Sequence, residues 1–522
     1  MSTRRVPELV DFAQERIRNL HFTWIAFFIS FYMWFNLAPL ATTMLREEGS
    51  WLTGDHLKLL AICNVALTIP ARILVGALID RFGPRRCFAG LLILTAIPVL
   101  LFAVGTTFMQ LLIARLLIST TGASFVIGIR MVAQWFPPKT VGRAEGFYAG
   151  WGNFGSAWAA MTLPWVALQL FGGGHDGWRW ALGVNGLVAM AYGVAYLFLV
   201  RDMPDGKPFV GVKKTQPMLL SNRADTWNYL LWSFPLVAAM GLLAWRMSTV
   251  PLAAGSAERV LSPTALWVVW GGLALGFVGH CWKTLQVNRE HQAVGVADDM
   301  KLHFGSVAAL NTTYFANFGA ELAVVSMLPA FFESTFTMSP TAAGLVASSF
   351  AFVNLFARPL GGLISDHVQS RKLTMVIYMV GIAAGFAGMA LITSSWPIWL
   401  AVALTVACSV FVQGAEGATF AIIPMINRRM TGQIAGMAGA YGNVGAVAYL
   451  VLFTLVDAAT FFWWLAAGAA LSVVACMIWL REPHGSHADE EPPVGGGEQR
   501  AAIATGAAGA APNSRHPAGA GR

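Results

Sequence analysis

The stretch Arg72-Ile-Leu-Val-Gly-Ala-Leu-Ile-Asp80-Arg-Phe-Gly-Pro-Arg-Arg86 places one arginine deep in an apolar run that ends in a basic turn. The stretch Arg358-Pro-Leu-Gly-Gly-Leu-Ile-Ser-Asp366-His-Val-Gln-Ser-Arg-Lys372 repeats it, with the arginine, a glycine, the aspartate and the basic residues in register. An arginine in the middle of a membrane-spanning helix costs roughly 3 kcal/mol on insertion scales. Two arginines at equivalent places need a common reason, and we expect them to bind one small anion together.

The composition is that of an integral membrane protein. The chain has 522 residues, of which 56% are hydrophobic and 11% charged, and its mean hydropathy is +0.60. These values fall outside the range of soluble domains. The apolar runs are continuous and close to the ~20 residues of a membrane-spanning helix, which favours helices over an outer-membrane barrel.

Charge and cysteine usage exclude several classes of function. The net charge is +8, but the basic residues lie between the apolar runs and form no single patch, so we expect no nucleic-acid partner. The five cysteines have no CxxC spacing, and we expect no metal site, disulfide or cofactor. The sequence contains no ATP-binding loop and no cluster of histidine, cysteine and aspartate, which argues against an enzyme.

The apolar runs divide the chain into two halves of six membrane-spanning helices each. They lie near 21–40, 57–79, 88–104, 111–136, 146–171 and 178–200, and then near 305–330, 344–364, 376–392, 399–426, 435–455 and 461–480. Two further runs, near 229–245 and 264–282, predict an inserted transmembrane hairpin and about 14 spans; the alternative is that one or both lie on the membrane surface. The predicted fold class is an all-α membrane protein with two pseudo-symmetric six-helix bundles.

The domain organisation follows this division. We assign 1–20 to an N-terminal segment without a cleaved signal, 21–200 to the first bundle, 201–303 to a linker with the hairpin, and 304–481 to the second bundle. The tail, 482–522, is rich in glycine, alanine and proline, and we expect it to be disordered. Basic residues gather in alternate connections, so both termini are expected in the cytoplasm of a multi-pass inner-membrane protein.

A second repeated element narrows the interpretation. Gly146-Phe-Tyr-Ala-Gly-Trp-Gly152-Asn153-Phe-Gly155 recurs as Gly436-Met-Ala-Gly-Ala-Tyr-Gly442-Asn443-Val-Gly445. Together with the paired basic turns, this chain resembles the nitrate/nitrite porters of the major facilitator superfamily. The resemblance covers most of the chain except the central hairpin. It implies a transporter, expected to be a monomer in membrane lipid, whose two bundles rock around an anion site at the bilayer midplane.

The resemblance implies that Arg72 and Arg358 clamp nitrate. The planar guanidinium group presents a fork of donors that matches a flat oxyanion, whereas lysine would bind less selectively. The alternative is that each arginine pairs with a buried acid. The same resemblance assigns the repeated glycine and asparagine motif to anion recognition, although small residues also allow close helix packing. The candidate residues in this motif are Asn153, Asn443, Gly152, Gly155, Gly442 and Gly445.

Aromatic residues complete the predicted anion site. Tyr314, Asn317, Phe318 and Glu321 are spaced to share one side of a helix. The resemblance places a tyrosine hydroxyl and a phenyl ring against the anion, which match Tyr314 and Phe318. It makes Phe125 and Phe31 further ring partners, although rings in such helices also serve ordinary packing.

Two acids suggest how transport is driven. Glu321 and Glu416 lie in membrane-spanning runs, and exchanger-type members of the resembled family carry no acid at either place. Two arginines alone would leave the empty site positively charged, which favours obligatory nitrate/nitrite exchange. Two glutamates bring it near neutrality and permit nitrate and proton symport, which is our prediction. Nitrate/nitrite exchange is the alternative. A further alternative is that both acids are structural partners of nearby groups and never titrate.

The residues of the two basic turns and two further arginines lie outside the predicted anion site. Asp80, Arg81, Arg85, Asp366 and Arg371 lie at helix ends that we expect to latch the two halves in one conformational state. Arg115 and Arg130 have no role that the sequence identifies. Two other functions stay open: a nitrate sensor with a transporter fold, and a carrier of another small anion, although sulfate or phosphate would fit an aromatic slot less well than a flat monoanion.

Overall fold

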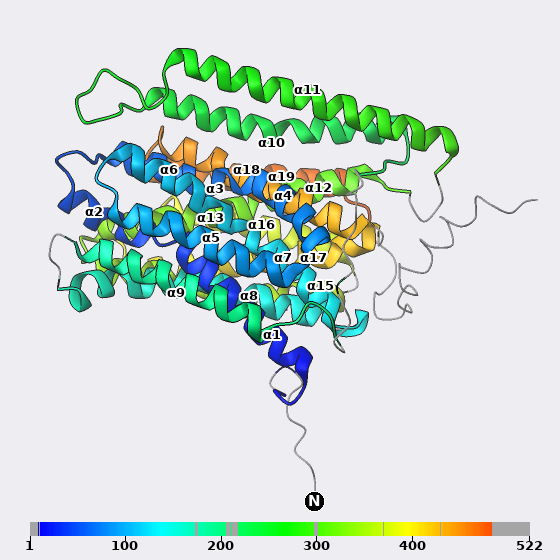
Figure 1. Ribbon diagram of the computed structural model, residues 1–522, viewed down its shortest axis with the longest axis horizontal. Coiled ribbons are helices and arrows are strands. Elements are labelled where there is room, and N and C mark those ends of the chain that lie inside the picture. Colours follow the sequence, from blue (N-terminus) through cyan, green and yellow to red (C-terminus); the bar gives the residue numbers. More distant parts are fainter. Residues whose placement is uncertain are drawn as a thin grey trace, which may run out of the picture.

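The computed structural model describes residues 9, 11–172, 176–204, 209, 218–296, 301–368, 370–427 and 430–482. Within these ranges the chain is helical, with one isolated β-bridge between Pro251 and Arg259. The long helices run side by side (Figure 1). Nearly all of the predicted N-terminal segment and the tail beyond Glu482 lie outside the described residues.

The first bundle consists of six membrane-spanning segments, three of which are interrupted. In chain order they are α1 (Glu15–Trp34), η2 (Ala38–Leu40) and α2 (Ala41–Glu47); α3 (Gly54–Ala66) and α4 (Thr68–Phe82); α5 (Pro84–Val104); α6 (Phe108–Ile118), η3 (Ser119–Ala123) and α7 (Ser124–Trp135); α8 (Pro138–Trp165) and η4 (Val166–Leu170); and α9 (Gly177–Leu199).

The second bundle repeats this order. Its segments are α12 (Phe304–Ala316) and α13 (Phe318–Phe336); α14 (Pro340–Phe352) and α15 (Asn354–His367); α16 (Arg371–Met389); α17 (Ile398–Ile426); α18 (Thr431–Phe453); and α19 (Ala458–Trp479). Between the bundles, α10 (Arg223–Thr249) and α11 (Pro263–Val294) form the hairpin.

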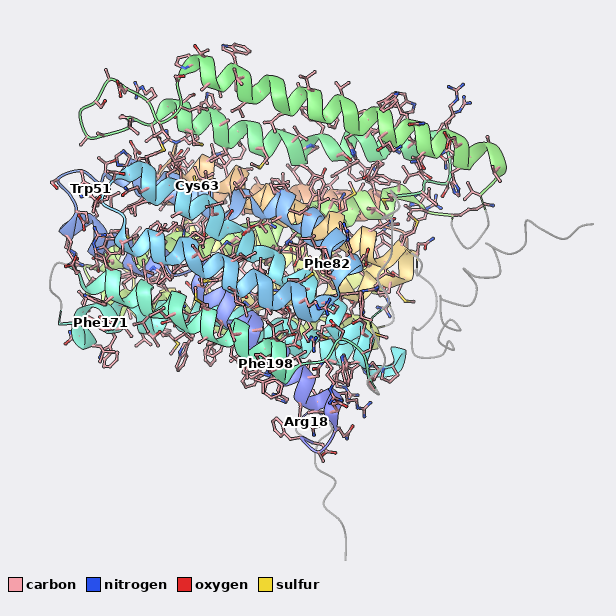
Figure 2. All side chains as sticks on the ribbon, viewed as in Figure 1. Arg18, Trp51, Cys63, Phe82, Phe171 and Phe198 are labelled. Carbon is pink, nitrogen blue, oxygen red and sulfur yellow. The ribbon has the colours of Figure 1, made fainter. Side chains whose placement is uncertain are left out.

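Thirteen helical segments of the described chain are long and apolar enough to cross a membrane. The hairpin helices α10 and α11 are among them, which is consistent with the predicted number of about 14 spans. Large apolar side chains cover the outside of the bundle, such as Phe198, which is 83% exposed (Figure 2). Such a surface is stable against lipid and not against water.

Helix α8 is long but is not among these thirteen segments. It is less apolar than they are because it carries the glycine and asparagine motif. It packs against α1 of its own half and against α14 and α15 of the other half. A Cβ atom on Gly152 would meet the ring of Phe27, and one on Gly155 would meet the carbonyl oxygen of Phe28. These glycines therefore permit close helix contact, the packing role that the sequence left open.

The hairpin lies along the seam between the two bundles (Figure 1). Helix α10 packs against α18 of the second bundle and α3 of the first, whereas α11 packs against α10 and is mostly exposed. Near the loop, Arg246 pairs with Asp55 at 3.5 Å, and the ring of His56 contacts the carbonyl oxygen of Pro251 at 2.9 Å. The hairpin is thus attached to both halves.

Five segments are interrupted partway along their length. The interruptions fall at 35–37, 67, 119–123, 317 and 353. At the fourth, the Asn317 side chain accepts a hydrogen bond from the amide of Phe318 and so caps the new helix α13. Interrupted membrane helices expose backbone carbonyl and amide groups, which membrane proteins tolerate where these line a site.

Candidate functional site

The two repeated arginines meet between the same two aromatic rings. Arg72 on α4 and Arg358 on α15 are each 3% exposed. The Arg72 guanidinium carbon lies 5.8 Å from the ring centre of Phe125 and 5.4 Å from that of Phe318. The corresponding distances for Arg358 are 5.5 and 5.7 Å. The structure therefore brings together four residues that the sequence selected from four different segments.

Arg72 is held by backbone carbonyl groups. Its Nε donates to the carbonyl oxygen of Gly122 at 3.3 Å, and its Nη1 donates to that of Gly439. Its Nη2 has no hydrogen-bond partner, and no carboxylate pairs with it within the described ranges. This guanidinium group thus keeps a full positive charge and an unused donor inside the protein.

Arg358 has a carboxylate partner, which differs from the predicted symmetric clamp. Its Nη1 lies 2.6 Å from Oε2 of Glu416, and its Nη2 donates to the Tyr314 hydroxyl at 2.8 Å. The pair forms because α17 packs very closely on α15: a Cβ atom on Gly417 would lie 2.0 Å from the carbonyl oxygen of Arg358. The alternative of a buried acid partner therefore holds for Arg358 and not for Arg72.

The second predicted acid lies beside the first. Glu321 and Glu416 are close enough to interact electrostatically, and their side chains are 2% and 0% exposed. The Asn354 amide donates to Oε1 of Glu321 at 2.7 Å. Asn354, which the sequence analysis missed, begins α15 and connects the acid to the helix of Arg358. Arginine, two acids and an amide thus form one buried polar cluster in the second half.

Phe420 is a second residue that the sequence analysis missed. Its ring lies 5.2 Å from that of Phe125 and 5.3 Å from that of Tyr314, with both pairs edge to face. The sequence does contain a pattern that could have identified Phe420, because Gly122-Ala-Ser-Phe125 recurs as Gly417-Ala-Thr-Phe420. The aromatic walls around the arginines therefore come from both halves.

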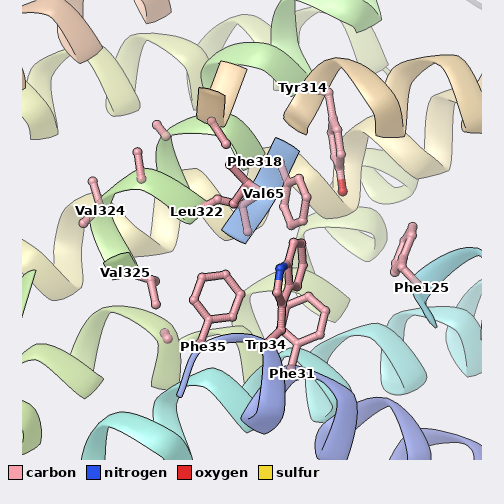
Figure 3. Close-up of a cluster of buried hydrophobic side chains, with 14 of the residues drawn as sticks. Phe31, Trp34, Phe35, Val65, Phe125, Tyr314, Phe318, Leu322, Val324 and Val325 are labelled. Carbon is pink, nitrogen blue, oxygen red and sulfur yellow. The ribbon is translucent and has the colours of Figure 1, made fainter. Parts of the chain in front are cut away.

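Phe31 takes part in a different cluster. Its ring packs on Phe27 at 4.6 Å, on Trp34 at 5.1 Å and on Phe35 at 5.7 Å, which is the ordinary packing that the sequence left open. Figure 3 shows Phe31, Trp34 and Phe35 gathered together and Phe125 apart from them. Through Phe27 this cluster reaches the site, because the Phe27 ring lies 5.8 Å from that of Phe125.

The two motif asparagines have different surroundings. Asn443 donates to the carbonyl oxygen of Gly439 at 3.2 Å, the same oxygen that accepts from Arg72, and its Oδ1 has no partner. Asn153 is fully buried, and in the described part of the chain neither polar atom of its amide has a partner. Buried amides without partners are rare and need explanation, such as a ligand or water.

The motif glycines of α18 contact the aromatic helix. A Cβ atom on Gly442 would lie 2.5 Å from the Phe318 ring, and one on Gly445 would lie 2.4 Å from the carbonyl oxygen of Phe315. These glycines allow Tyr314 and Phe318 to reach the arginines. They therefore shape the site by letting α18 pack closely on α12 and α13.

The pseudo-symmetry breaks at the acids. Aligning the repeats on Arg72 and Arg358, Phe31 and Phe318, and Phe125 and Phe420 identifies the first-half counterparts of the polar cluster. Glu321, Asn354 and Glu416 correspond to Trp34, Thr68 and Thr121. The first half thus presents a cation without an acid, and the second half presents a cation with two acids.

The basic turns are held within their own halves. Asp80 pairs with Arg130 at 3.8 Å, which gives Arg130 a partner that the sequence did not identify. Asp202 accepts from the amide of Arg85 at 2.7 Å and caps α5. Burial raises the pKa of the Asp202 carboxyl, and its hydrogen bond from Arg85 opposes this.

The second basic turn is held in the same way. Glu482 accepts from the amide of Arg371 at 2.6 Å and from that of Lys372 at 3.1 Å. In the first basic turn, the Arg81 guanidinium carbon lies 5.2 Å from the ring centre of its neighbour Phe82. The side chain of Asp366 lies outside the described residues. The latch between halves that we predicted for these residues stays a prediction.

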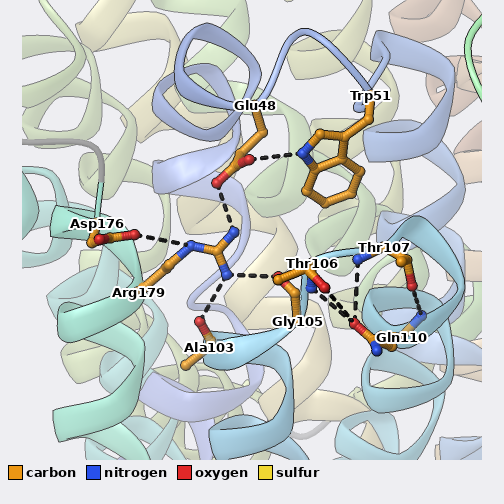
Figure 4. A network of polar contacts seen from close by, with 9 residues as sticks. All are labelled: Glu48, Trp51, Ala103, Gly105, Thr106, Thr107, Gln110, Asp176 and Arg179. Carbon is orange, nitrogen blue, oxygen red and sulfur yellow. Dashed lines mark hydrogen bonds and ion pairs between the residues drawn. The ribbon is translucent and has the colours of Figure 1, made fainter.

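The opposite end of the bundle does connect the two halves. Thr42 donates to Oε2 of Glu333 at 2.7 Å, and Arg46 lies 3.5 Å from Oε1 of the same carboxylate. Beside them, Arg179 pairs with Glu48 at 2.7 Å and donates to the last carbonyl groups of α5 (Figure 4). This end of the bundle is closed by polar contacts from both halves.

Comparison with known proteins then gives the family. The model of the Major Facilitator Superfamily matches residues 23–285 and 310–513, which is most of the chain. The chain belongs to the Major Facilitator Superfamily. Within this superfamily it is a member of the nitrate/nitrite porters, as the sequence predicted. The nitrate/nitrite transporter NrtP of Picosynechococcus is 44% identical to it over 515 residues, which covers 91% of this chain and 94% of that protein.

Other members of the superfamily are also similar to this chain. The nitrate/nitrite transporter NrtP of Nostoc punctiforme is 44% identical over 480 residues, which covers 91% of this chain and 94% of that protein. The high affinity nitrate transporter 2.5 of Arabidopsis thaliana is 27% identical over 454 residues, which covers 85% of this chain and 75% of that protein. The xylose transporter XylE from E. coli, in a partially occluded inward open conformation, shares the fold with a TM-score of 0.59 and 14% identity, covering 90% of this chain and 99% of that one. These relatives are named as transporters, so this member of the superfamily is a multi-pass transporter and not an enzyme.

Proposed function

We propose that the protein carries nitrate across the inner membrane together with a proton, by alternating access. The observation that carries this proposal is the unequal pairing of the repeated arginines: Glu416 holds Arg358, while Arg72 has no acid partner within the described ranges. Both termini would lie in the cytoplasm, because the basic turns gather at that end of the bundle. The names of the relatives support nitrate as the substrate, with nitrite as a second one.

The space around the arginines suits a flat monoanion. The rings of Phe125 and Phe318 flank both guanidinium groups, and the unused Nη2 of Arg72 supplies a donor. A trigonal oxyanion lies in the plane of such donors and presents its faces to aromatic rings. A tetrahedral dianion would bring a second charge, for which the described site offers no further free cation.

A charge count explains the coupling. With both arginines and both glutamates ionised, the empty site is neutral, and binding of nitrate would leave one uncompensated negative charge. A proton on Glu416 would cancel that charge and release Nη1 of Arg358 to the anion. Anion and proton would therefore bind together more favourably than either binds alone.

One observation favours the second candidate, nitrate/nitrite exchange. Glu321 and Glu416 belong to the same buried polar cluster and interact electrostatically, and carboxyl groups coupled in this way tend to share one proton. If that proton is retained throughout the cycle, the empty site carries one positive charge. The carrier would then return across the membrane only with an anion bound.

The deciding experiment uses purified protein in proteoliposomes with a pH-sensitive dye inside. Symport predicts that external nitrate acidifies the lumen in vesicles that contain no nitrite or nitrate. Uptake that strictly requires internal nitrite or nitrate, without acidification, would replace the proposal by exchange. Failure to transport either anion would refute both candidates.

A further inference from the structure

Arg115 on α6 is a buried cation that the anion site does not use directly. Its side chain is fully buried. Its Nη1 donates to Oδ1 of Asn36 at 2.7 Å, and its Nη2 donates to the carbonyl oxygen of Trp34 at 2.9 Å. No carboxylate pairs with it in the chain as described, and its titratable neighbour is the thiol of Cys63. Within the described residues its charge is thus balanced by an amide, a carbonyl group and the Phe102 ring, whose centre lies 5.6 Å from the guanidinium carbon, and by no anion.

The position of Arg115 relates it to the site. Trp34 is the last residue of α1, so Arg115 caps a helix C-terminus, where unpaired carbonyl groups and the helix dipole favour a cation. Gly122 follows seven residues later on the same segment, and its carbonyl oxygen holds Nε of Arg72. At about 1.5 Å per residue, Arg115 and Gly122 are separated by roughly 10 Å along the segment, which sets the scale of the distance between the two charges.

The Trp34 ring makes the link direct. A Cβ atom on Gly122 would lie 2.6 Å from the Trp34 ring, so this ring is pressed against the backbone that holds Arg72. On the backbone side of the same residue, the Trp34 carbonyl oxygen accepts the hydrogen bond from Nη2 of Arg115. No counterpart exists in the second half, where the repeat of Gly122 and Phe125 as Gly417 and Phe420 places Val410 at this position.

We propose that Arg115 sets the anion affinity of the site electrostatically, as a second uncompensated cation of the first half. This inference rests on the proposed function. The first half would hold the anion with two cations, and the second half would hold the proton with two acids. A unit charge about 10 Å away changes a binding constant about 15-fold at an effective dielectric constant of 20, and about twofold in water. Partial balance by the helix end reduces this to roughly three- to tenfold.

The test neutralises the charge without removing the arginine. In Asn36→Asp the new carboxylate lies where Nη1 of Arg115 already donates, and the Asn185 amide, now 3.1 Å from Nδ2 of Asn36, can turn to donate instead. We expect the Kd for nitrate, measured on the purified full chain by isothermal titration, to rise three- to tenfold in Asn36→Asp and in Arg115→Gln. We expect less than a twofold change in Arg115→Lys and in Arg259→Gln, which removes a charge from the exposed hairpin loop.

The outcomes separate the two proposals. Absence of nitrate binding by the unaltered protein would refute the proposed function itself. If the unaltered protein binds nitrate, and Asn36→Asp keeps both its melting temperature and its Kd, the role of Arg115 is wrong. If Arg115→Lys binds as weakly as Arg115→Gln while Asn36→Asp binds normally, hydrogen bonding and not charge matters, which also overturns the inference.

Discussion

Nη1 of Arg358 lies 2.6 Å from Oε2 of Glu416, whereas its repeat partner Arg72 donates hydrogen bonds only to carbonyl oxygens in the described structure. The two halves therefore offer different chemistry at equivalent places. Breaking a buried ion pair by removing one partner leaves an uncompensated charge. The role of Glu416 can thus be tested through the arginine that it releases.

The first prediction concerns Glu416→Gln. An uncharged amide keeps the shape but no longer neutralises Arg358, so the anion should bind at least as tightly while proton coupling is lost. We expect uptake driven by a pH gradient to fall at least tenfold, with nitrate counterflow between equal pH values retained. Glu321→Gln serves as the comparison, because its acid bonds Asn354 and not an arginine. Full pH-driven uptake in Glu416→Gln would contradict the proposed coupling.

The second prediction concerns the arginines. A lysine at position 72 can replace the charge but cannot bond the carbonyl groups of Gly122 and Gly439 and still offer a planar donor. We expect Arg72→Lys to lower kcat/KM for nitrate about 100-fold. Arg358→Lys keeps a cation for Glu416, so we expect a smaller loss, about tenfold. Nitrate flux into vesicles measures both, and equal wild-type fluxes would refute the anion site.

The third prediction uses Gly439, whose carbonyl oxygen connects Arg72 and Asn443. A Cβ atom there would lie 2.8 Å from Nη1 of Arg72 and would displace that group. Gly439→Ala should lower nitrate affinity several-fold with little change in melting temperature, since the arginine end can move. Gly436→Ala on the same helix is the matched control, because nothing lies within 4 Å of its added Cβ. Equal affinity in both variants would show that the position of Arg72 does not matter.

The fourth prediction concerns the closed end of the bundle. Thr42 and Arg46 of the first half share the carboxylate of Glu333 of the second. Glu333→Gln should weaken these contacts and increase the population open at this end. Ser326, which lines a small pocket behind them together with Asn64, reports the opening when changed to cysteine. We expect faster labelling of Ser326→Cys by an impermeant maleimide in the Glu333→Gln background, and unchanged labelling would argue that other contacts close this end.

Much of this protein was determined by its sequence. Hydropathy predicted the order of the membrane segments and their approximate number, because a helix in lipid must be about 20 apolar residues long and must satisfy its own backbone. The repeats identified Arg72 and Arg358, because polar groups in such helices persist at a cost, and the resemblance to the nitrate/nitrite porters added Phe125 and Phe318. These four residues lie close together in the structure.

The tertiary structure decided how the charges are partnered. Sequence could not show that Glu416 reaches Arg358, because that contact depends on how closely α17 packs on α15 at Gly417. It could not show that Arg115 faces the end of α1, because the interruption at 35–37 creates the carbonyl acceptor. Pattern and composition report which residues are costly in a membrane, whereas partners are set by distances between helices that only packing fixes.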